Sequence, residues 1–528
     1  MSQIPRSLQL LNASEVSNVV VSRENTTIYP TGGQDYPSGV NGGGVIEFKV
    51  PVSSNKSIDM STFFIHFNAQ ITNKTANSFV YFEDSIESVI DEVTIYVGNG
   101  GQEIERIRGY NRLESALNYY VNNGFVNSFG GSAMAAGLTM EERKSLWMNN
   151  ANGYADTSGA IVQCSIPLRL SGVCNPSFIM PSAVFGQSNF LIIRIRLNRP
   201  SACLLSYTAT EITNAAGVIA GGDRSAATTA QYTLSNVRAS FDFIQTTQDY
   251  QNQINQFLAS NNLVYPVKTW DVDFRAIPAG QSTFVENLSY NYRDIEAIFF
   301  WFNLQSELGS FVYHGEDRLH VPSLASFGAE VISSLQLTIN GSKVPSQPID
   351  LRFGASEGFS HLLSALGVLH TSEQMGPFNF EKLQSMLIAY SGSSAESRVM
   401  YSSTTANRYY GRNKSVAQSN GLTLGSNNLS TSNIKHDTAA SIVDTIFPET
   451  NPYLNDTTPS YFLIGINLRK LLDLPEGQLS GLNLSSTSGS IGYDLRFTQS
   501  TTNAYSMGVA VLHNRFISLS GAGTVVDI

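Results

Sequence analysis

Histidine and carboxylate side chains gather in one short segment, His314-Gly-Glu316-Asp317-Arg-Leu-His320. Imidazole nitrogens and carboxylate oxygens bind divalent cations, so these side chains could converge on a metal ion. The segment follows an aromatic strand, and metal-binding sequences usually show tighter paired spacing. We therefore favour a solvated polar loop and assign no metal-binding residues.

A glycine-rich turn, Gly98-Asn-Gly-Gly101, is the second pattern with chemical potential. Loops that cradle phosphate open a helix directly after a buried parallel strand, and they carry Gly-x-Gly-x-x-Gly or a Lys-Ser/Thr ending. Neither ending occurs here, and Gly521-Ala-Gly523 also lacks a lysine. An Asn-Gly pair supplies the positive φ angles of a hairpin turn. We predict a hairpin and assign no cofactor-binding residues.

Nucleophilic catalysis has no complete set of residues in this chain. Ser53-Ser-Asn-Lys56 matches Ser-x-x-Lys but precedes a strand, and no Gly-x-Ser-x-Gly elbow is present. Cys164 alternates with the apolar residues Val162 and Ile166 on a predicted strand, which is typical of a small core residue. We assign no catalytic residues and predict that the protein is not an enzyme.

Length and charge limit the class of protein. The 528 residues exceed the roughly 250 to 300 at which one hydrophobic core stops growing, so at least two cores are expected. The net charge is −10, whereas a wholesale nucleic-acid binder would be expected to be basic. The aromatic run Ile298-Phe-Phe-Trp-Phe302 has no basic residue, which favours core packing over base stacking.

The cysteine content and the N-terminus bear on the compartment. Three cysteines, Cys164, Cys174 and Cys203, are too few for a disulfide framework, so we expect assembly in a reducing compartment. The N-terminal sequence lacks an apolar signal region, and the most apolar run, residues 295–304, is shorter than the roughly 18 residues needed to cross a bilayer. We predict no secretion signal and no membrane span.

The elements that must position these residues are mainly strands. Alternating apolar residues with many β-branched and aromatic side chains predict strands over 45–50, 93–97, 191–197, 237–243 and 335–339. Helical periodicity is limited to three short stretches, 110–121, 250–259 and 359–369. Because no regular helix alternates with the strands, we predict antiparallel sheets.

An internal duplication organises the chain. Asn99 and Asn340 each begin a turn that follows an alternating strand and precedes an amphipathic segment, 340 − 99 = 241 residues apart. Further matched motifs are the aromatic strands 63–68 and 299–303, Ile-Pro-Leu-Arg at 166–169 and Ile-Asn-Leu-Arg at 466–469, and the strands around Ile193 and Tyr493. The later pairs are about 300 residues apart. We predict that the copies superpose with Val93 over Leu335 and Ile193 over Tyr493.

The longer second copy contains an insertion. Residues 391–440 are rich in Ser, Asn, Gly and Thr without periodicity, which predicts a long surface loop with a shorter counterpart at 127–160. Between the copies, Tyr250, Ile254, Phe257 and Leu258 form one apolar helical face. We divide the chain into an N-terminal arm (1–44), a first β domain (45–245), a bridging helix (246–262) and a second β domain (263–528).

This duplicated unit of strand, Asn-Gly turn, short helix, long loop and Ile-x-Leu-Arg motif resembles the double jelly-roll major capsid proteins of double-stranded DNA viruses, in particular those of virophages and polinton-like viruses. The resemblance covers residues 45–519. It implies an all-β fold of two tandem eight-stranded antiparallel jelly rolls with a few short helices and long surface loops. It also implies that three chains form a pseudo-hexagonal capsomer, with the loops 127–160 and 391–440 facing outward.

The leading hypothesis is a structural major capsid protein of an icosahedral virion. Its partners would be itself, as a homotrimer within a lattice of capsomers, and penton and minor capsid proteins, without sequence-specific nucleic-acid binding. The alternative is a tandem β-sandwich binding protein, such as a carbohydrate-recognising spike, with Tyr401, Arg408, Tyr409, Tyr410 and Arg412 as its binding loop. An enzyme of the cupin or glycosidase type would need convergent histidines or paired carboxylates in each roll, and the duplicated strands show none.

Overall fold

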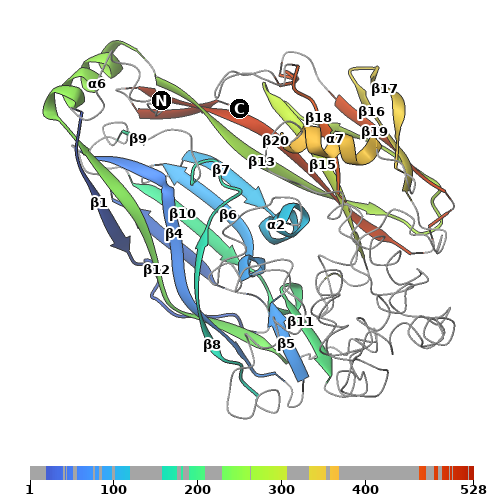
Figure 1. The fold of residues 1–528 in the computed structure, drawn as a ribbon, viewed down its shortest axis with the longest axis horizontal. Coiled ribbons are helices and arrows are strands. Elements are labelled where there is room, and N and C mark those ends of the chain that lie inside the picture. The colour runs from blue at the N-terminus through green and yellow to red at the C-terminus, as the bar shows by residue number, and fades with distance from the viewer. Residues whose placement is uncertain are drawn as a thin grey trace, which may run out of the picture.

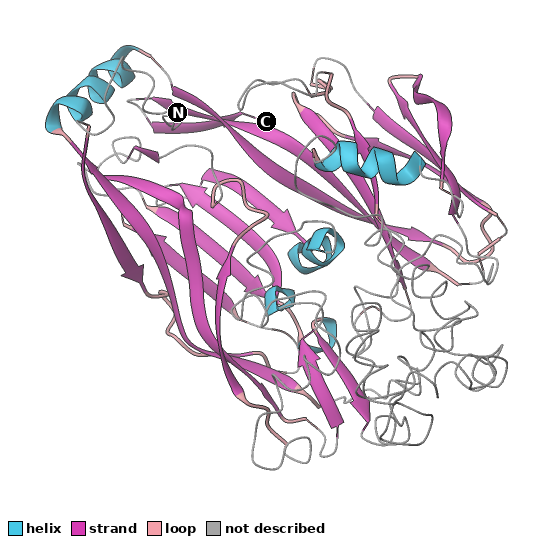
Figure 2. Cartoon of the chain, viewed as in Figure 1, coloured by secondary structure: helices cyan, strands magenta, loops and turns pink. Residues whose placement is uncertain are grey.

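A computed structural model gives the fold of the chain (Figure 1). The structure describes residues 19–39, 42, 44–51, 56–74, 78–82, 86–97, 102–118, 157–174, 180–181, 190–208, 229–261, 263–305, 308, 332–351, 357–367, 463–470, 481–485, 490–498, 500–501, 503–520 and 523–527. Strands make up most of this part of the chain, and they gather in two bodies (Figure 2). The predicted loops 127–160, up to residue 156, and 391–440 lie outside the described residues, as does the segment 314–320.

The first body contains two antiparallel sheets. Its main strands are β1 (Val20–Ile28), β3 (Val45–Val50), β4 (Lys56–Thr72), β6 (Ile90–Val97), β7 (Gln102–Arg108), β8 (Ile161–Pro167), β10 (Leu191–Leu197) and β12 (Gln231–Thr246). They form the sheets β1-β12-β4-β8 and β3-β10-β6-β7. Short strands add to this frame: β2 (Tyr36–Pro37), β5 (Ser78–Phe82), β9 (Met180–Pro181) and β11 (Leu204–Thr208).

The second body repeats this plan. Its strands are β13 (Leu263–Ile277), β14 (Thr283–Ser289), β15 (Ile295–Leu304), β16 (Ile332–Ile339), β17 (Ser342–Asp350), β18 (Ile464–Asn467), β19 (Ser490–Phe497), β20 (Tyr505–Ser520) and β21 (Gly523–Asp527). They form the sheets β13-β20-β15-β18, with β21 beside β20, and β14-β19-β16-β17.

Both bodies are jelly rolls. When the main strands of each described body are numbered one to eight along the chain, both have the sheet orders 1-8-3-6 and 2-7-4-5. Two such sheets of antiparallel strands packed face to face define a jelly roll. The predicted all-β fold of two tandem eight-stranded jelly rolls is therefore confirmed.

The strand register confirms the predicted equivalence of the two copies. Equivalent positions make equivalent pairs: Ile195 with Val93 and Leu495 with Leu335, and Ile193 with Ile95 and Tyr493 with Leu337. A one-residue slip would turn every side chain to the opposite face of its sheet. The two copies are thus equivalent residue by residue in these strands, with equivalent positions facing each core.

Strand β1 lies within the segment that we predicted as an N-terminal arm. It pairs antiparallel with β12, from Val20 opposite Thr246 to Ile28 opposite Ala239. Most of its side chains are exposed, because β1 is the edge strand of its sheet. Its sequence VVSRENTTI has no regular apolar alternation for this reason, and the periodicity that identified the other strands is missing from it.

The three predicted helical stretches are helices, α2 (Tyr110–Asn118), α6 (Gln248–Ser260) and α7 (Glu357–Leu366). Helix α6 lies between the last strand of the first roll and the first strand of the second, and follows β12 with Thr247 as its N-cap. The side chain of Thr247 accepts a hydrogen bond from the backbone N–H of Tyr250 (3.4 Å). The Asn340-Gly341 turn has positive φ angles at both residues and joins β16 to β17, as an Asn-Gly hairpin requires.

Burial distinguishes the two 1-8-3-6 sheets. Strand β4 of the first roll alternates between buried and partly exposed residues over most of its length. Its counterpart β15 is buried from Ile295 to Asn303, including Phe299 and Trp301, which have no exposed surface. A strand that is buried on both faces has an almost continuous apolar sequence. The second roll therefore has a covering layer on the outer face of this sheet.

A substitution at Gly508 tests how closely this sheet is packed around Trp301. A Cβ atom at Gly508 would lie 2.1 Å from Cε2 of Trp301, so no side chain fits there without moving the indole. We expect Gly508→Ala to lower the free energy of unfolding by about 3 kcal/mol, as overpacked cores do. Gly32→Ala is the control, because its nearest neighbour would be the Tyr36 hydroxyl at 3.7 Å. Denaturant titrations that give equal stabilities for the two variants would contradict this packing.

Candidate functional site: the join between the rolls

Helix α2 lies between the two rolls (Figure 1). Tyr110, at its first turn, belongs to the core of the first roll. Leu113, Ala116 and Leu117 belong to the core of the second roll. One short helix thus contributes to both cores. We call the region where residues 104–117 and 168–173 of the first roll meet β13 and β20 the join.

The start of α2 is fitted closely to the second roll. Gly109 has a φ angle of 58°, and a Cβ atom there would lie 2.6 Å from the ring of Phe274 on β13. The guanidinium of Arg112 lies over the same ring, with Cζ 4.7 Å from its centroid. Leu170 and Trp270 pack against both cores. Apolar contact is therefore continuous across the join.

A buried carboxylate organises the polar part of the join. Glu105 of β7 has no exposed surface and accepts hydrogen bonds from Ser171 Oγ and from the backbone N–H of Gly172 (2.8 Å) and Val173 (3.4 Å). Burial raises the pKa of Glu105, and these hydrogen bonds oppose the shift. The loop that Glu105 holds rests on β13, because a Cβ atom at Gly172 would lie 1.8 Å from the carbonyl oxygen of Lys268.

The arginine of the first Ile-x-Leu-Arg motif makes ion pairs at the join. Arg169 Nη2 lies 3.1 Å from Oε2 of Glu87, which is fully buried, and also pairs with Glu114. Glu114 lies on α2, between the residues that enter the second core. Arg169 therefore fixes α2 to the end of β8 while the apolar side of the helix packs on the neighbouring roll.

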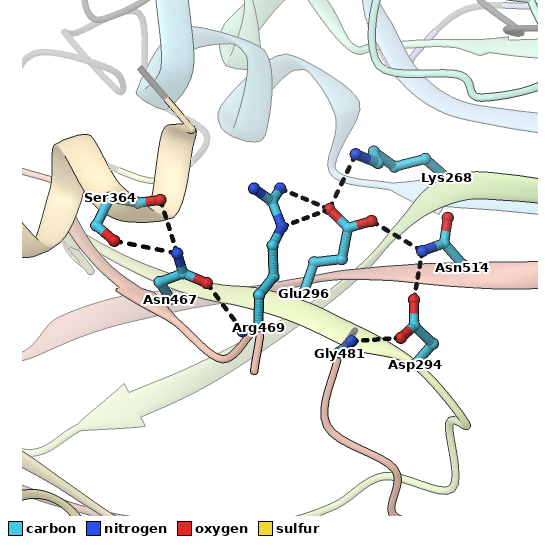
Figure 3. A network of polar contacts seen from close by, with 8 residues as sticks. All are labelled: Lys268, Asp294, Glu296, Ser364, Asn467, Arg469, Gly481 and Asn514. Atoms are coloured by element: carbon cyan, nitrogen blue, oxygen red, sulfur yellow. Dashed lines mark hydrogen bonds and ion pairs between the residues drawn. The ribbon is translucent and has the colours of Figure 1, made fainter. Parts of the chain in front are cut away.

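The equivalent arginine of the second copy is also paired (Figure 3). Arg469 Nη2 and Lys268 Nζ lie 2.6 Å and 2.9 Å from Oε2 of Glu296. Asn514 Nδ2 donates to Glu296 Oε1 (2.8 Å) and to Asp294 Oδ2 (2.5 Å). Burial alone would raise the pKa of Glu296, but Lys268 and Arg469 outweigh it, so this pKa lies below its usual value.

Asn467 replaces the proline of the first motif and has a contact of its own (Figure 3). Its side-chain amide donates to the carbonyl oxygen and to the hydroxyl of Ser364 on α7, both at 3.0 Å. Its side-chain oxygen accepts from the backbone N–H of Arg469 (2.9 Å). Proline cannot make these side-chain bonds. The asparagine at this position of the second copy therefore attaches α7 to β18 of the second roll.

The remaining candidates from the sequence have structural roles where they are described. Cys164 is buried in the first core, and burial raises the pKa of its thiol to about 12, which keeps it protonated. Lys56 pairs with Glu24 of the edge strand at 2.5 Å. Among the described residues, no group of three His, Cys, Asp or Glu side chains could hold a metal ion. No helix in the same ranges is long and apolar enough to cross a membrane.

Comparison with known proteins identifies relatives in fold. No family model matches the sequence, and no curated protein matches it. The crystal structure of PBCV-1 VP54, fitted into a cryo-EM reconstruction of the virophage Sputnik, has a TM-score of 0.50 at 11% identity, covering 98% of this chain and 100% of that chain. The chain is thus a double jelly-roll protein, with both rolls included in the match.

Two further solved structures are similar to this chain. The cryo-EM structure of the Sputnik virophage has a TM-score of 0.49 at 11% identity, covering 100% of this chain and 92% of that chain. The Faustovirus major capsid protein has a TM-score of 0.49 at 9% identity, covering 97% of this chain and 92% of that chain.

Arg469 provides a test of the buried ion pairs. We expect Arg469→Met to lower the free energy of unfolding by about 3 kcal/mol, because it removes a partner of the buried Glu296 carboxylate. Arg496→Met is the matched control, because Arg496 is 57% exposed in its pair with Asp494 and its loss should cost far less than the loss of Arg469. Equal losses in urea denaturation would show that the buried pair has no special role.

The buried side chain of His513 should make the free energy of unfolding depend on pH. Burial and the nearby Arg515 lower the pKa of His513 to about 3, and its ring stacks on Tyr292 with centroids 3.7 Å apart. The folded chain keeps His513 neutral while the unfolded chain binds a proton below pH about 6.5, so this group makes stability fall as the pH falls. Between pH 7 and 5 the loss from this residue should be about 2 kcal/mol. The stability of His513→Phe should fall correspondingly less over this range, and an unchanged pH slope would contradict the assignment.

Proposed function

We propose that this protein is the major capsid protein of an icosahedral double-stranded DNA virus. The observation that carries the proposal is the likeness in fold to PBCV-1 VP54 over both rolls, since that protein has been fitted into the reconstruction of a virophage. In this proposal the chain is a structural component of the virion and not an enzyme. Its functional property is self-association.

The paired rolls suit a lattice-forming subunit. Three chains with two rolls each place six similar bodies around a threefold axis, and such a pseudo-hexagonal capsomer can tile a curved shell. The rolls of one chain already pack side by side through the join, as the rolls of a ring must do. Low charge density, with 14% charged residues, limits repulsion between neighbouring subunits.

The proposed assembly needs a second kind of contact, between chains. A closed ring brings the first roll of one chain against the second roll of the next, which is a heterologous contact repeated three times. A permanent contact of this kind buries more than roughly 2,000 Å². Penton and minor capsid proteins would complete the shell at its vertices and inner surface.

Light scattering on the purified chain tests this proposal. We expect a mass three times that of one chain, stable on dilution, because large heterologous interfaces close the ring. A monomer at high concentration would count against the capsid protein. A monomer that also binds glycans would favour the alternative, a carbohydrate-recognising spike.

Deletion of residues 400–435, which lie within the predicted outer loop 391–440, tests whether the rolls depend on this loop. We propose that this segment contributes little to either core, so the shortened chain should fold and form the same oligomer. The melting temperature and the mass in solution measure both properties. Loss of the soluble oligomer would assign a structural role to this segment.

A further inference from the structure

The contact between the two rolls of the chain is heterologous. The first roll contributes β7 and α2, whereas the second contributes β13 and the outer face of its 1-8-3-6 sheet. In the common numbering, strand five of the first roll thus meets strand one of the second roll. Arg515 on β20 reinforces this contact by donating from Nη1 to the carbonyl oxygen of Ile104 on β7 (3.0 Å).

A heterologous contact uses one surface of each partner and leaves the other surface of each unused. Within the part of the chain that the structure describes, the surfaces that this contact leaves unused are strand one of the first roll, which is β1, and strand five of the second roll, which is β17. Both are edge strands with mostly exposed side chains. The counterpart of β17 in the first roll, β7, has Ile104 and Glu105 buried within the join.

The register shows which residues of the first roll correspond to the covered face of the second. Ile65 pairs with Ile166 and Ala239, as Ile298 pairs with Ile466 and Val511. From this anchor the equivalent pairs on the outer face follow directly: Thr27 with Trp270, His66 with Phe299, Asn68 with Trp301 and Ser240 with Leu512. At these four pairs the sheet that the chain covers carries apolar side chains, and the sheet that no described residue of the other roll covers carries polar ones. The neighbouring pair is an exception, because Phe64 of the first roll is equivalent to Ala297 of the second.

The uncovered face is ordered by its own polar contacts. The His66 ring nitrogens lie 2.7 Å from the hydroxyl oxygens of Ser165 and Ser240. Arg23 on β1 pairs with Asp242 and Asp59. This network holds the side chains in place without a partner, which lowers the entropy cost of a later association. A polar face also keeps the separate chain soluble before it assembles.

We propose that β1 and the adjoining outer face of the β1-β12-β4-β8 sheet bind the β17 edge of a second copy of this chain. The contact repeats, between chains, the packing of β7 on β13 within the chain. Pro345 and Pro348 lack the N–H groups that would extend a sheet from β17, so the two edges meet through side chains. This inference rests on the proposed capsomer and names the two surfaces that close it.

Four substitutions in the full chain test the proposal. Thr27→Arg places a large cation on β1, and Ser346→Arg places one on β17, at exposed positions in both cases. Thr283→Arg is the matched control, because Thr283 is exposed on β14, at the opposite edge of its sheet from β17. We expect light scattering to show trimers for the wild type and the control, and monomers for the other two. These monomers should still unfold in one cooperative thermal transition, at a lower temperature than the wild type, because the contacts of the trimer no longer stabilise the folded chain. Thr27→Glu is a second variant of β1, should the arginine disturb folding.

The outcomes separate this inference from the proposed function. A trimer in Thr27→Arg and Thr27→Glu, or in Ser346→Arg, would overturn the assigned surfaces and leave the capsid protein standing. A wild-type monomer at high concentration would overturn the proposed function and the inference together. Loss of the trimer in Thr283→Arg as well would also reject the assignment, because the effect would then not be confined to the β1 and β17 surfaces.

Discussion

Burial of both faces of one sheet is the constraint on which the rest of the molecule depends. The 1-8-3-6 sheet of the second roll carries Phe299 and Trp301 on its outer face and Phe300 on the face toward its own core. Exposed to water, this outer face would be a large apolar patch. The first roll, through α2, and the helix α7 cover it. The two rolls therefore stabilise each other and act as one body, instead of two independent domains on a linker.

Buried polar groups define how the rolls meet. Apolar packing alone tolerates small rotations, whereas Glu105 accepts hydrogen bonds from one particular loop and Arg169 pairs with one particular helix. Desolvation offsets much of the energy of such groups, so their main effect is on geometry. A subunit that must repeat the same angle around a ring benefits from this kind of restraint, since a small error in each contact would prevent closure.

The sequence predicted the features that depend on local periodicity and repetition. Apolar alternation in β6 and β10 predicted these strands. The matched motifs of the second copy predicted the duplication and the structural equivalence of Val93 and Leu335. Strand β1 was not recognised, because most side chains of this edge strand are exposed to solvent and its sequence therefore shows no apolar periodicity. The roles of Arg169 and Arg469 were missed as well. Their motif marked the duplication, but their partners Glu87, Glu114 and Glu296 lie at unrelated distances along the chain.

The central claim is that two joined rolls per chain form a ring of six rolls. Electron microscopy of the purified oligomer in negative stain tests it most directly, because the outline of a capsomer is visible in class averages. The account predicts particles with threefold symmetry and a nearly hexagonal outline of six lobes. Particles with two lobes, corresponding to a single chain, or open filaments of variable length, would contradict it.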